Sequence, residues 1–289
     1  MTFMNRRQML TLALPLLVRA NDASSRPRLR TAICAYSFRE ELAKKTLTYE
    51  DLVLRAVEWD VDGLDLTVYW FPSTQPEFLL PLRRTAYRNG VEIYSISVRS
   101  ELTKPAAAAR AAEVSKLCGW VDVADQLGAS HIRVFGGDVP KGYSEDQAVP
   151  WVVECLLRAS DYAARKGVIL GLENHGGITT TAQRILEIVR KVDSPWVAVN
   201  LDTGNFRSDA FRQIEMCLPY AANVQVKSEM FGEDGKQRIP QDWDRVVGMI
   251  AKAGYKGYLA LEYEAKEPAM TAVPALMARL RELTRRHAG

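Results

Sequence analysis

The chain has 289 residues, of which 47% are hydrophobic and 25% are charged, a composition typical of a globular protein. Its formal net charge is only +3, and several arginines stand near the N-terminus, so the rest of the chain is close to neutral. This balance argues against a nucleic-acid-binding protein, and the length suits either one large α/β barrel or two smaller domains.

The first segment is typical of an export signal. The pair Arg6 and Arg7 precedes an apolar stretch over residues 9–18, which is too short to span a bilayer as a helix. Twin arginines favour the bacterial route that exports folded proteins, and an amphipathic first helix is the alternative. We therefore expect a signal peptide over residues 1–20, a flexible tether over 21–30, and a periplasmic or otherwise exported protein that meets the membrane only through export or signal anchoring.

From residue 31 onward, short apolar runs rich in Val, Ile and Tyr alternate with segments of helical periodicity, several of which end in glycine. The expected strands are 31–38, 63–70, 91–98, 131–137, 168–175, 197–202, 223–229 and 258–264. This alternation predicts an α/β protein: a single-domain (β/α)8 TIM barrel over 31–289. An open doubly wound sheet is the alternative, but no Gly-x-Gly-x-x-Gly follows the first expected strand.

The four cysteines, Cys34, Cys118, Cys155 and Cys217, are far apart in the sequence and have no CxxC spacing. Export would permit disulfides, but the sequence cannot pair these residues. We expect buried free thiols.

Polar side chains stand at the ends of four consecutive expected strands. Glu173 and Asp202 end the fifth and sixth, and Gln225 and Glu262 lie in the seventh and eighth. Because the carboxyl ends of barrel strands converge and side chains alternate, these four should gather around one point. Three carboxylates so close would repel one another without a cation, and oxygen ligands suit one Mn²⁺ or Mg²⁺ ion, with Co²⁺ as a further option. For a single strand-end glutamate, a surface or salt-bridged role is the alternative.

The stretches "GLENHGG", "NLDTGN", "NVQVKSE" and "LALEYE", together with "IRVFGG", resemble the xylose isomerase-like TIM barrel superfamily of sugar phosphate isomerases and epimerases. Its relatives include ketose 3-epimerases and inosose dehydratases, and the resemblance covers nearly the whole chain after the leader. In that family a Glu, an Asp, a His and a second Glu hold one divalent metal. The resemblance therefore implies a metal on Glu173, Asp202, Gln225 and Glu262.

The chain departs from the family pattern at three places. Gln225 stands where many relatives have His, and its amide oxygen would be a weaker, neutral ligand. Asn205 stands where ketose epimerases often carry a substrate-binding His. The arginine that those epimerases place shortly after the ligand of the seventh strand is missing from "VKSEMF".

The chemistry that the resemblance implies is proton abstraction next to a carbonyl. We assign the two acid/base roles to Glu173 and Glu262, both also touching the metal. The expected substrate contacts are His175, Lys227, Arg133, Arg99 and Asn205. The alternative for Arg133 is a salt bridge to a carboxylate inside the barrel, and for His175 a structural hydrogen bond.

Epimerisation, isomerisation and elimination share this chemistry, and a barrel that only binds sugar is a separate class of function. The leading function is a sugar isomerase or epimerase acting on an uncharged sugar or keto-sugar, since export and the lack of clustered arginines argue against a phosphate. The alternatives are an exported lyase or dehydratase acting on 3-keto-glycosides or inososes, and a non-catalytic sugar-binding barrel. Only three histidines are present, which excludes the trinuclear zinc endonucleases of the same superfamily. Whether the protein forms a homo-oligomer stays open.

Overall fold

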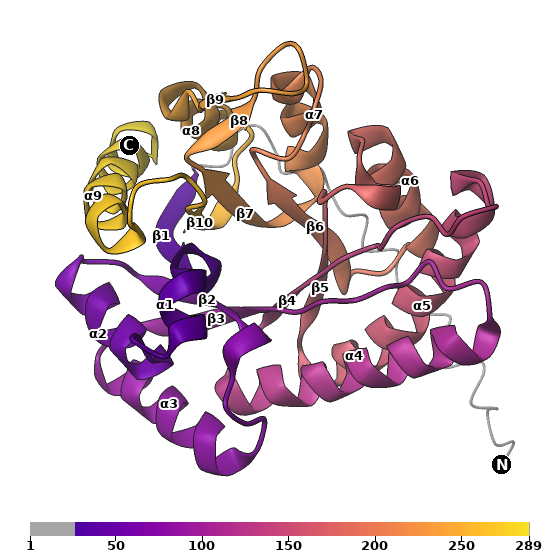
Figure 1. Ribbon diagram of the computed structural model, residues 1–289, viewed down its shortest axis with the longest axis horizontal. Helices are drawn as coiled ribbons and strands as arrows, with labels where there is room; N and C mark the ends of the chain where they lie inside the picture. Colours follow the sequence, from indigo (N-terminus) through magenta and orange to yellow (C-terminus); the bar gives the residue numbers. More distant parts are fainter. Residues whose placement is uncertain (1–26, 289) are drawn as a thin grey trace, which may run out of the picture.

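Eight parallel strands close into a barrel in the computed structural model, which describes residues 27–288. Their order around the barrel is β1-β10-β7-β6-β5-β4-β3-β2, so neighbours in the chain are neighbours in space (Figure 1). The strands are β1 (Arg28–Cys34), β2 (Gly63–Thr67), β3 (Glu92–Ser97), β4 (His131–Val134), β5 (Ile169–Glu173), β6 (Val197–Asp202), β7 (Ala221–Lys227) and β10 (Lys256–Glu262). The predicted TIM barrel is confirmed.

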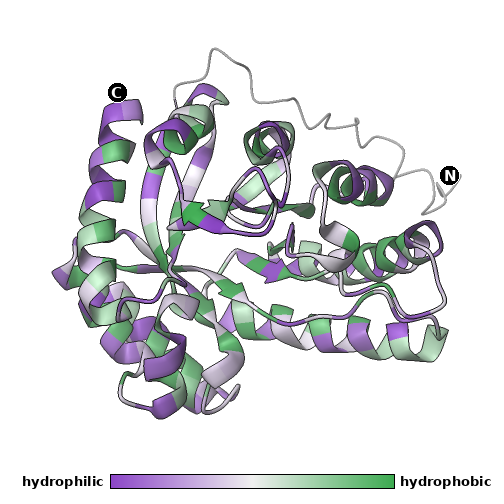
Figure 2. Ribbon diagram, turned by 45° about the horizontal axis from the view of Figure 1, so that its top comes forward, coloured by the Kyte–Doolittle hydropathy of each residue, from purple (hydrophilic) through white to green (hydrophobic). Residues whose placement is uncertain are grey.

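Helices surround the strands in a ring (Figure 1). They are α1 (Arg39–Lys44), α2 (Tyr49–Glu58), α3 (Pro76–Arg88), α4 (Ala107–Leu127), α5 (Glu145–Lys166), α6 (Ala182–Val192), α7 (Ala210–Cys217), α8 (Trp243–Lys252) and α9 (Ala269–Ala288). Hydrophobic and hydrophilic residues alternate in stripes along these helices (Figure 2), because only the face that packs on the barrel is buried. Gly128 and Gly167 end α4 and α5 in the left-handed conformation, as the glycines before the strands predicted.

Most strands differ from the sequence-based expectation by one to four residues at one or both ends. β1 begins at Arg28, which pairs with Lys256 of β10, so residues 28–30 belong to the barrel rather than to the tether. The first two strands end early because the chain turns into short 3-10 helices, η2 (Ala35–Phe38) and η3 (Val68–Trp70). The expected signal peptide and most of the expected tether lie outside the described residues.

A small antiparallel hairpin, β8 (Glu229–Phe231) with β9 (Arg238–Pro240), leaves the end of β7 and was not predicted. Asp234 accepts two backbone hydrogen bonds in its turn, and Gly235 has a φ of 64°. An Asp-Gly pair is a recognised hairpin signal, so the sequence carried the evidence for this element.

No helix within residues 27–288 is long and apolar enough to cross a membrane. All four cysteines are free, as expected, and Cys34, Cys155 and Cys217 are buried while Cys118 is half-buried.

The interior of β5 leaves no room for a side chain at Gly171. A Cβ atom there would lie 2.2 Å from Nε2 of His131, whose Nδ1 is 2.8 Å from the Ser95 hydroxyl. We therefore expect Gly171→Ala to lower the free energy of unfolding by about 1–3 kcal/mol, the usual cost of overpacking.

The matched control is Gly119→Ala at an exposed position of α4, where a Cβ would meet no atom within 4 Å. This variant should be neutral or stabilising by up to about 1 kcal/mol, because alanine favours a helix. Urea unfolding of both variants checks the prediction, and equal stabilities would contradict it.

Candidate active site

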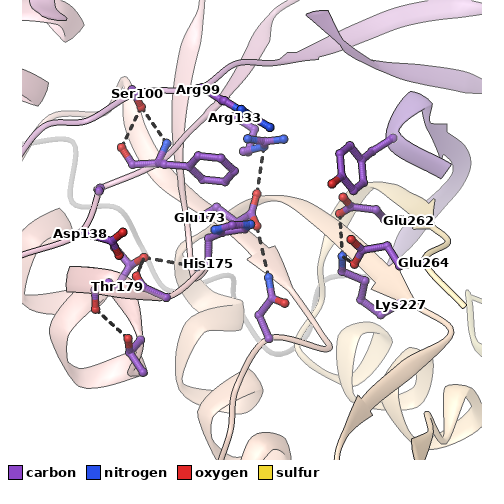
Figure 3. A pocket seen from close by; sticks show the side chains of 18 of the residues that line it. Arg99, Ser100, Arg133, Asp138, Glu173, His175, Thr179, Lys227, Glu262 and Glu264 are labelled. Atoms are coloured by element: carbon purple, nitrogen blue, oxygen red, sulfur yellow. Dashed lines mark hydrogen bonds and ion pairs between the residues drawn. The ribbon is translucent and has the colours of Figure 1, made fainter. Parts of the chain in front are cut away.

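A cavity of about 530 Å³ opens where the strands end, and its size suits a small ligand. Polar and charged side chains dominate its wall (Figure 3). Of the nine predicted site residues, seven line this cavity: Arg99, Arg133, Glu173, His175, Asn205, Lys227 and Glu262. The other two, Asp202 and Gln225, are fully buried beneath it. The carboxyl ends of the strands therefore form a single polar site, as the barrel predicts.

The end of β5 positions the first carboxylate. Nε of Arg133 in β4 lies 2.9 Å from Oε2 of Glu173, and both side chains are nearly inaccessible to solvent. The Asn205 amide also donates to Glu173, at 3.3 Å. Burial raises the pKa of the Glu173 carboxyl, and the Arg133 guanidinium partly offsets this effect. The salt-bridge alternative weighed for Arg133 is thus what the structure shows, at the cavity wall.

Asn174, the next residue in "GLENHGG", joins the ends of two strands. Its amide donates to the carbonyl oxygen of Asp202 at 2.8 Å and accepts from the Asp202 backbone N–H at 2.8 Å. Gly176 and Gly177 then turn the chain with φ of 114° and 52°, values that side chains disfavour. The polar run therefore anchors β5 to β6 and reverses the chain over the cavity.

The second charged group is centred on Lys227 at the end of β7. Its Nζ lies 3.3 Å from Oδ2 of Asp202 and 3.3 Å from Oε2 of Glu262, and it also donates to Glu264 (Figure 3). Burial alone would lower the pKa of Lys227, but the three carboxylates raise it well above its ordinary value. Lys227 is therefore a permanently charged ammonium among three acidic side chains.

The Lys227 side chain is held by its surroundings. Gly204 lies against its stem, and a Cβ there would come within 2.6 Å of Cγ of Lys227. The Lys227 backbone N–H donates to Thr203, and the Trp243 indole donates to the Lys227 carbonyl. Glycine in "DTGN" thus makes space for the lysine.

Gln225 belongs to a polar layer below the cavity. Its Oε1 accepts from Asn200 at 2.8 Å, and its Nε2 donates to Oδ2 of Asp65 at 3.3 Å. Asn223 continues the layer by donating to Asn200, and Ser97 donates to Asp65. The amide oxygen that could ligate a metal is therefore directed at Asn200 and uses one of its two lone pairs there.

As they stand, the four predicted metal ligands do not form one ligand set. No cluster of three or more His, Cys, Asp or Glu side chains within residues 27–288 is arranged to hold a metal ion. Glu173 faces Arg133, and Gln225 is turned into the layer below. Oδ2 of Asp202 and Oε2 of Glu262 accept no hydrogen bond from the described residues, and both face the Lys227 ammonium.

The histidines have different roles. His175 lines the cavity and packs on Phe135 with ring centroids 4.0 Å apart. Burial and the nearby cations Arg133 and Lys227 lower the pKa of His175 to about 4, so it is a neutral hydrogen-bonding group near pH 7. His131 is buried against Ser95, away from the cavity, and His287 contacts Asp244 near the C-terminus.

Sequence reasoning missed the cavity residues that the hairpin contributes. Phe231 and Arg238 line the cavity together with Arg207, and both guanidinium groups lie over the Phe231 ring. Among the described side chains, Arg99, Arg207 and Arg238 form no ion pair. These arginines are far apart in the sequence, so only the fold reveals their grouping. Glu264 stands with Glu262 in "LALEYE" at a spacing of two residues, but sequence reasoning assigned it no role in the site.

The sequence matches the family model described as xylose isomerase-like TIM barrel over residues 53–283. The chain belongs to this family. No curated protein sequence matches it.

Solved structures of the same architecture have low sequence identity to this member of the family. D-psicose 3-epimerase with D-tagatose from Clostridium cellulolyticum H10 is 17% identical with a TM-score of 0.69, covering 90% of this chain and 95% of that one. The IolI protein with a binding zinc atom is 14% identical with a TM-score of 0.72, covering 90% and 98%. The probable 3-DHS dehydratase AsbF from Bacillus anthracis is 18% identical with a TM-score of 0.69, covering 87% and 98%. These likenesses show the fold.

The buried pair Arg133–Glu173 should be needed for stability. Arg133→Met leaves the Glu173 carboxylate buried without its cation, so we expect the free energy of unfolding to fall by about 3–5 kcal/mol. Adding Glu173→Gln should recover most of this loss, because the double variant buries no unpaired charge. A double-mutant cycle from urea unfolding measures the coupling, and a loss below about 1 kcal/mol in the single variant would contradict it.

Proposed function

We propose that the protein is an enzyme that transfers protons at a carbon next to a carbonyl group of a sugar, as an isomerase or epimerase. The observation that carries this proposal is the placement of two buried carboxylates, Glu173 and Glu262, on either side of one cavity with a buried cation beside each (Figure 3). Such a pair can work on both faces of a bound carbon atom.

The charges at the strand ends favour a proton shared among the buried carboxylates. Glu173, Asp202, Glu262 and Glu264 supply four carboxylates at the strand ends, and the cations that form ion pairs with them among the described residues are Arg133 and Lys227. Burial, reinforced by the neighbouring carboxylates, raises the pKa of Glu262 to about 7. A carboxyl group that titrates near neutral pH can both accept and donate a proton under ordinary conditions.

The proposed reaction begins when one of the two carboxylates removes the proton from the carbon next to the carbonyl. The C–H electron pair forms a carbon–carbon double bond, and the carbonyl electron pair moves to oxygen, giving an enediolate. The other group, in its carboxylic acid form, returns a proton to the opposite face and yields the epimer. In the reverse direction Glu173 and Glu262 exchange roles.

Lys227 and Arg133 supply the electrostatic stabilisation in this scheme. Both line the cavity and stay charged, so either can face the oxygen on which negative charge develops. His175 and Asn205 line the same cavity and can hydrogen-bond sugar hydroxyl groups as neutral partners.

Elimination is the second candidate, because it starts with the same proton abstraction. A lyase or dehydratase acting on a 3-keto-glycoside or an inosose would also need a proton donor for the leaving group. The Glu262 carboxyl lines the cavity and its pKa is raised to about 7, so in its acid form it can supply that proton while Glu173 removes the proton from carbon. Proposed export through the twin-arginine signal would limit either enzyme to substrates outside the cytoplasm.

The charge of the substrate needs a direct test. The sequence favours an uncharged sugar or keto-sugar because no arginines cluster along the chain. The fold, however, places Arg99, Arg207 and Arg238 on the cavity wall without a carboxylate partner among the described residues. A substrate panel should therefore include sugar acids beside neutral ketoses, keto-sugars and 3-keto-glycosides.

Glu173→Gln and Glu262→Gln should each reduce the incorporation of deuterium from D₂O into the substrate by more than about 10²-fold. An amide can neither remove the proton from carbon nor return it. Mass spectrometry of the panel measures exchange, a new epimer or a released leaving group. Glu215→Gln on α7, an exposed glutamate outside the cavity, is the matched control and should exchange like the wild type.

Exchange at the wild-type rate in both cavity variants would contradict the assignment of the pair. Binding of a sugar without any exchange in the wild type would instead support the non-catalytic sugar-binding barrel.

A further inference from the structure

We infer that the Lys227 ammonium is the resident cation of the buried carboxylate cluster, and that a divalent metal ion competes with it for Asp202 and Glu262. The sequence assigned Lys227 to substrate contact only. The structure places its Nζ 3.3 Å from one oxygen of each of these two predicted ligands. The inference concerns cation binding and stands independently of the proposed reaction.

Strand register explains why the lysine reaches this position. Lys227 is level with Glu262 of β10, whereas Gln225 is level with Ala260 of β10 and Asp202 of β6. Gln225 and Lys227, which face the same way along β7, therefore lie at different depths. Gln225 joins the Asn200–Asp65 layer below, and Lys227 enters the cluster at the level of Glu262.

The position of the Lys227 side chain is fixed by the groups that surround it. Its side chain is only 6% exposed and lies against Gly204, where any Cβ would collide with it. Oδ2 of Asp202 and Oε2 of Glu262 accept no hydrogen bond from other described residues. The ammonium is thus the charge that compensates both oxygens.

A metal ion and the ammonium cannot share these oxygens. A divalent ion bound to the same two oxygens would have to lie within about 2–2.5 Å of each, and each oxygen is 3.3 Å from Nζ. Two cations so close together in a buried site would repel strongly. The metal can therefore bind only when Lys227 moves away. Because this movement breaks three ion pairs, it lowers the affinity of the site for the metal.

The test is a titration with Mn²⁺, followed by the electron paramagnetic resonance signal of the free ion. We expect Lys227→Met to bind Mn²⁺ at least about 10-fold more tightly than the wild type, because the competing charge is gone and three carboxylates are left uncompensated. Lys252→Met on α8, an exposed lysine, is the matched control and should bind Mn²⁺ like the wild type.

A second measurement, the melting temperature, can be used if Lys227→Met folds poorly without a metal ion. Lys227→Met should show a melting temperature that rises with Mn²⁺ concentration much more steeply than that of the wild type. Equal or weaker Mn²⁺ binding by Lys227→Met would overturn the inference. If this variant does not fold even with Mn²⁺, the wild type decides: a dissociation constant below about 10 μM overturns the inference, and a weaker one supports it.

Discussion

The compensation of buried negative charge is the constraint on which this site depends. Parallel strands that end in acidic residues bring Glu173, Asp202 and Glu262 to one end of the barrel, out of water. Isolated carboxylates in such a place are costly, so each needs a cation or a proton close by. Arg133 and Lys227 lie on strands next to those that carry the carboxylates and form ion pairs with them. The rest of the local structure can be understood as the means of holding these two cations in place.

That support is spread over several elements. Gly204 leaves space for the lysine stem, Trp243 at the start of α8 fixes the Lys227 carbonyl, and Asn174 ties β5 to β6. Below them, the Gln225–Asn200–Asp65 layer continues the hydrogen bonding into the interior of the barrel, where Asn223 donates to Asn200. Because these contacts link consecutive strands, the charged groups keep their relative positions as long as the barrel stays closed.

The strands, and the end of the barrel at which the site lies, were predictable from the sequence because they depend on local signals. Apolar runs mark the strands, and a polar residue at the end of each marks the face that binds ligands. The roles of individual site residues depend on register, which a single sequence does not reveal. Lys227 and Gln225 face the same way, and only the pairing with β10 and β6 shows which of them reaches Glu262. The β8–β9 hairpin was missed although its Asp-Gly turn was visible.

The hairpin has a consequence for how such a site can change over time. It leaves the barrel after Lys227 and returns before α8, so it contributes Phe231 and Arg238 to the cavity without taking part in the eight-strand ladder. Insertions or substitutions there would reshape the rim while the buried carboxylates kept their register. The lining of the cavity rim and the buried charged groups therefore belong to separate parts of the fold, and the rim can change without loss of the barrel.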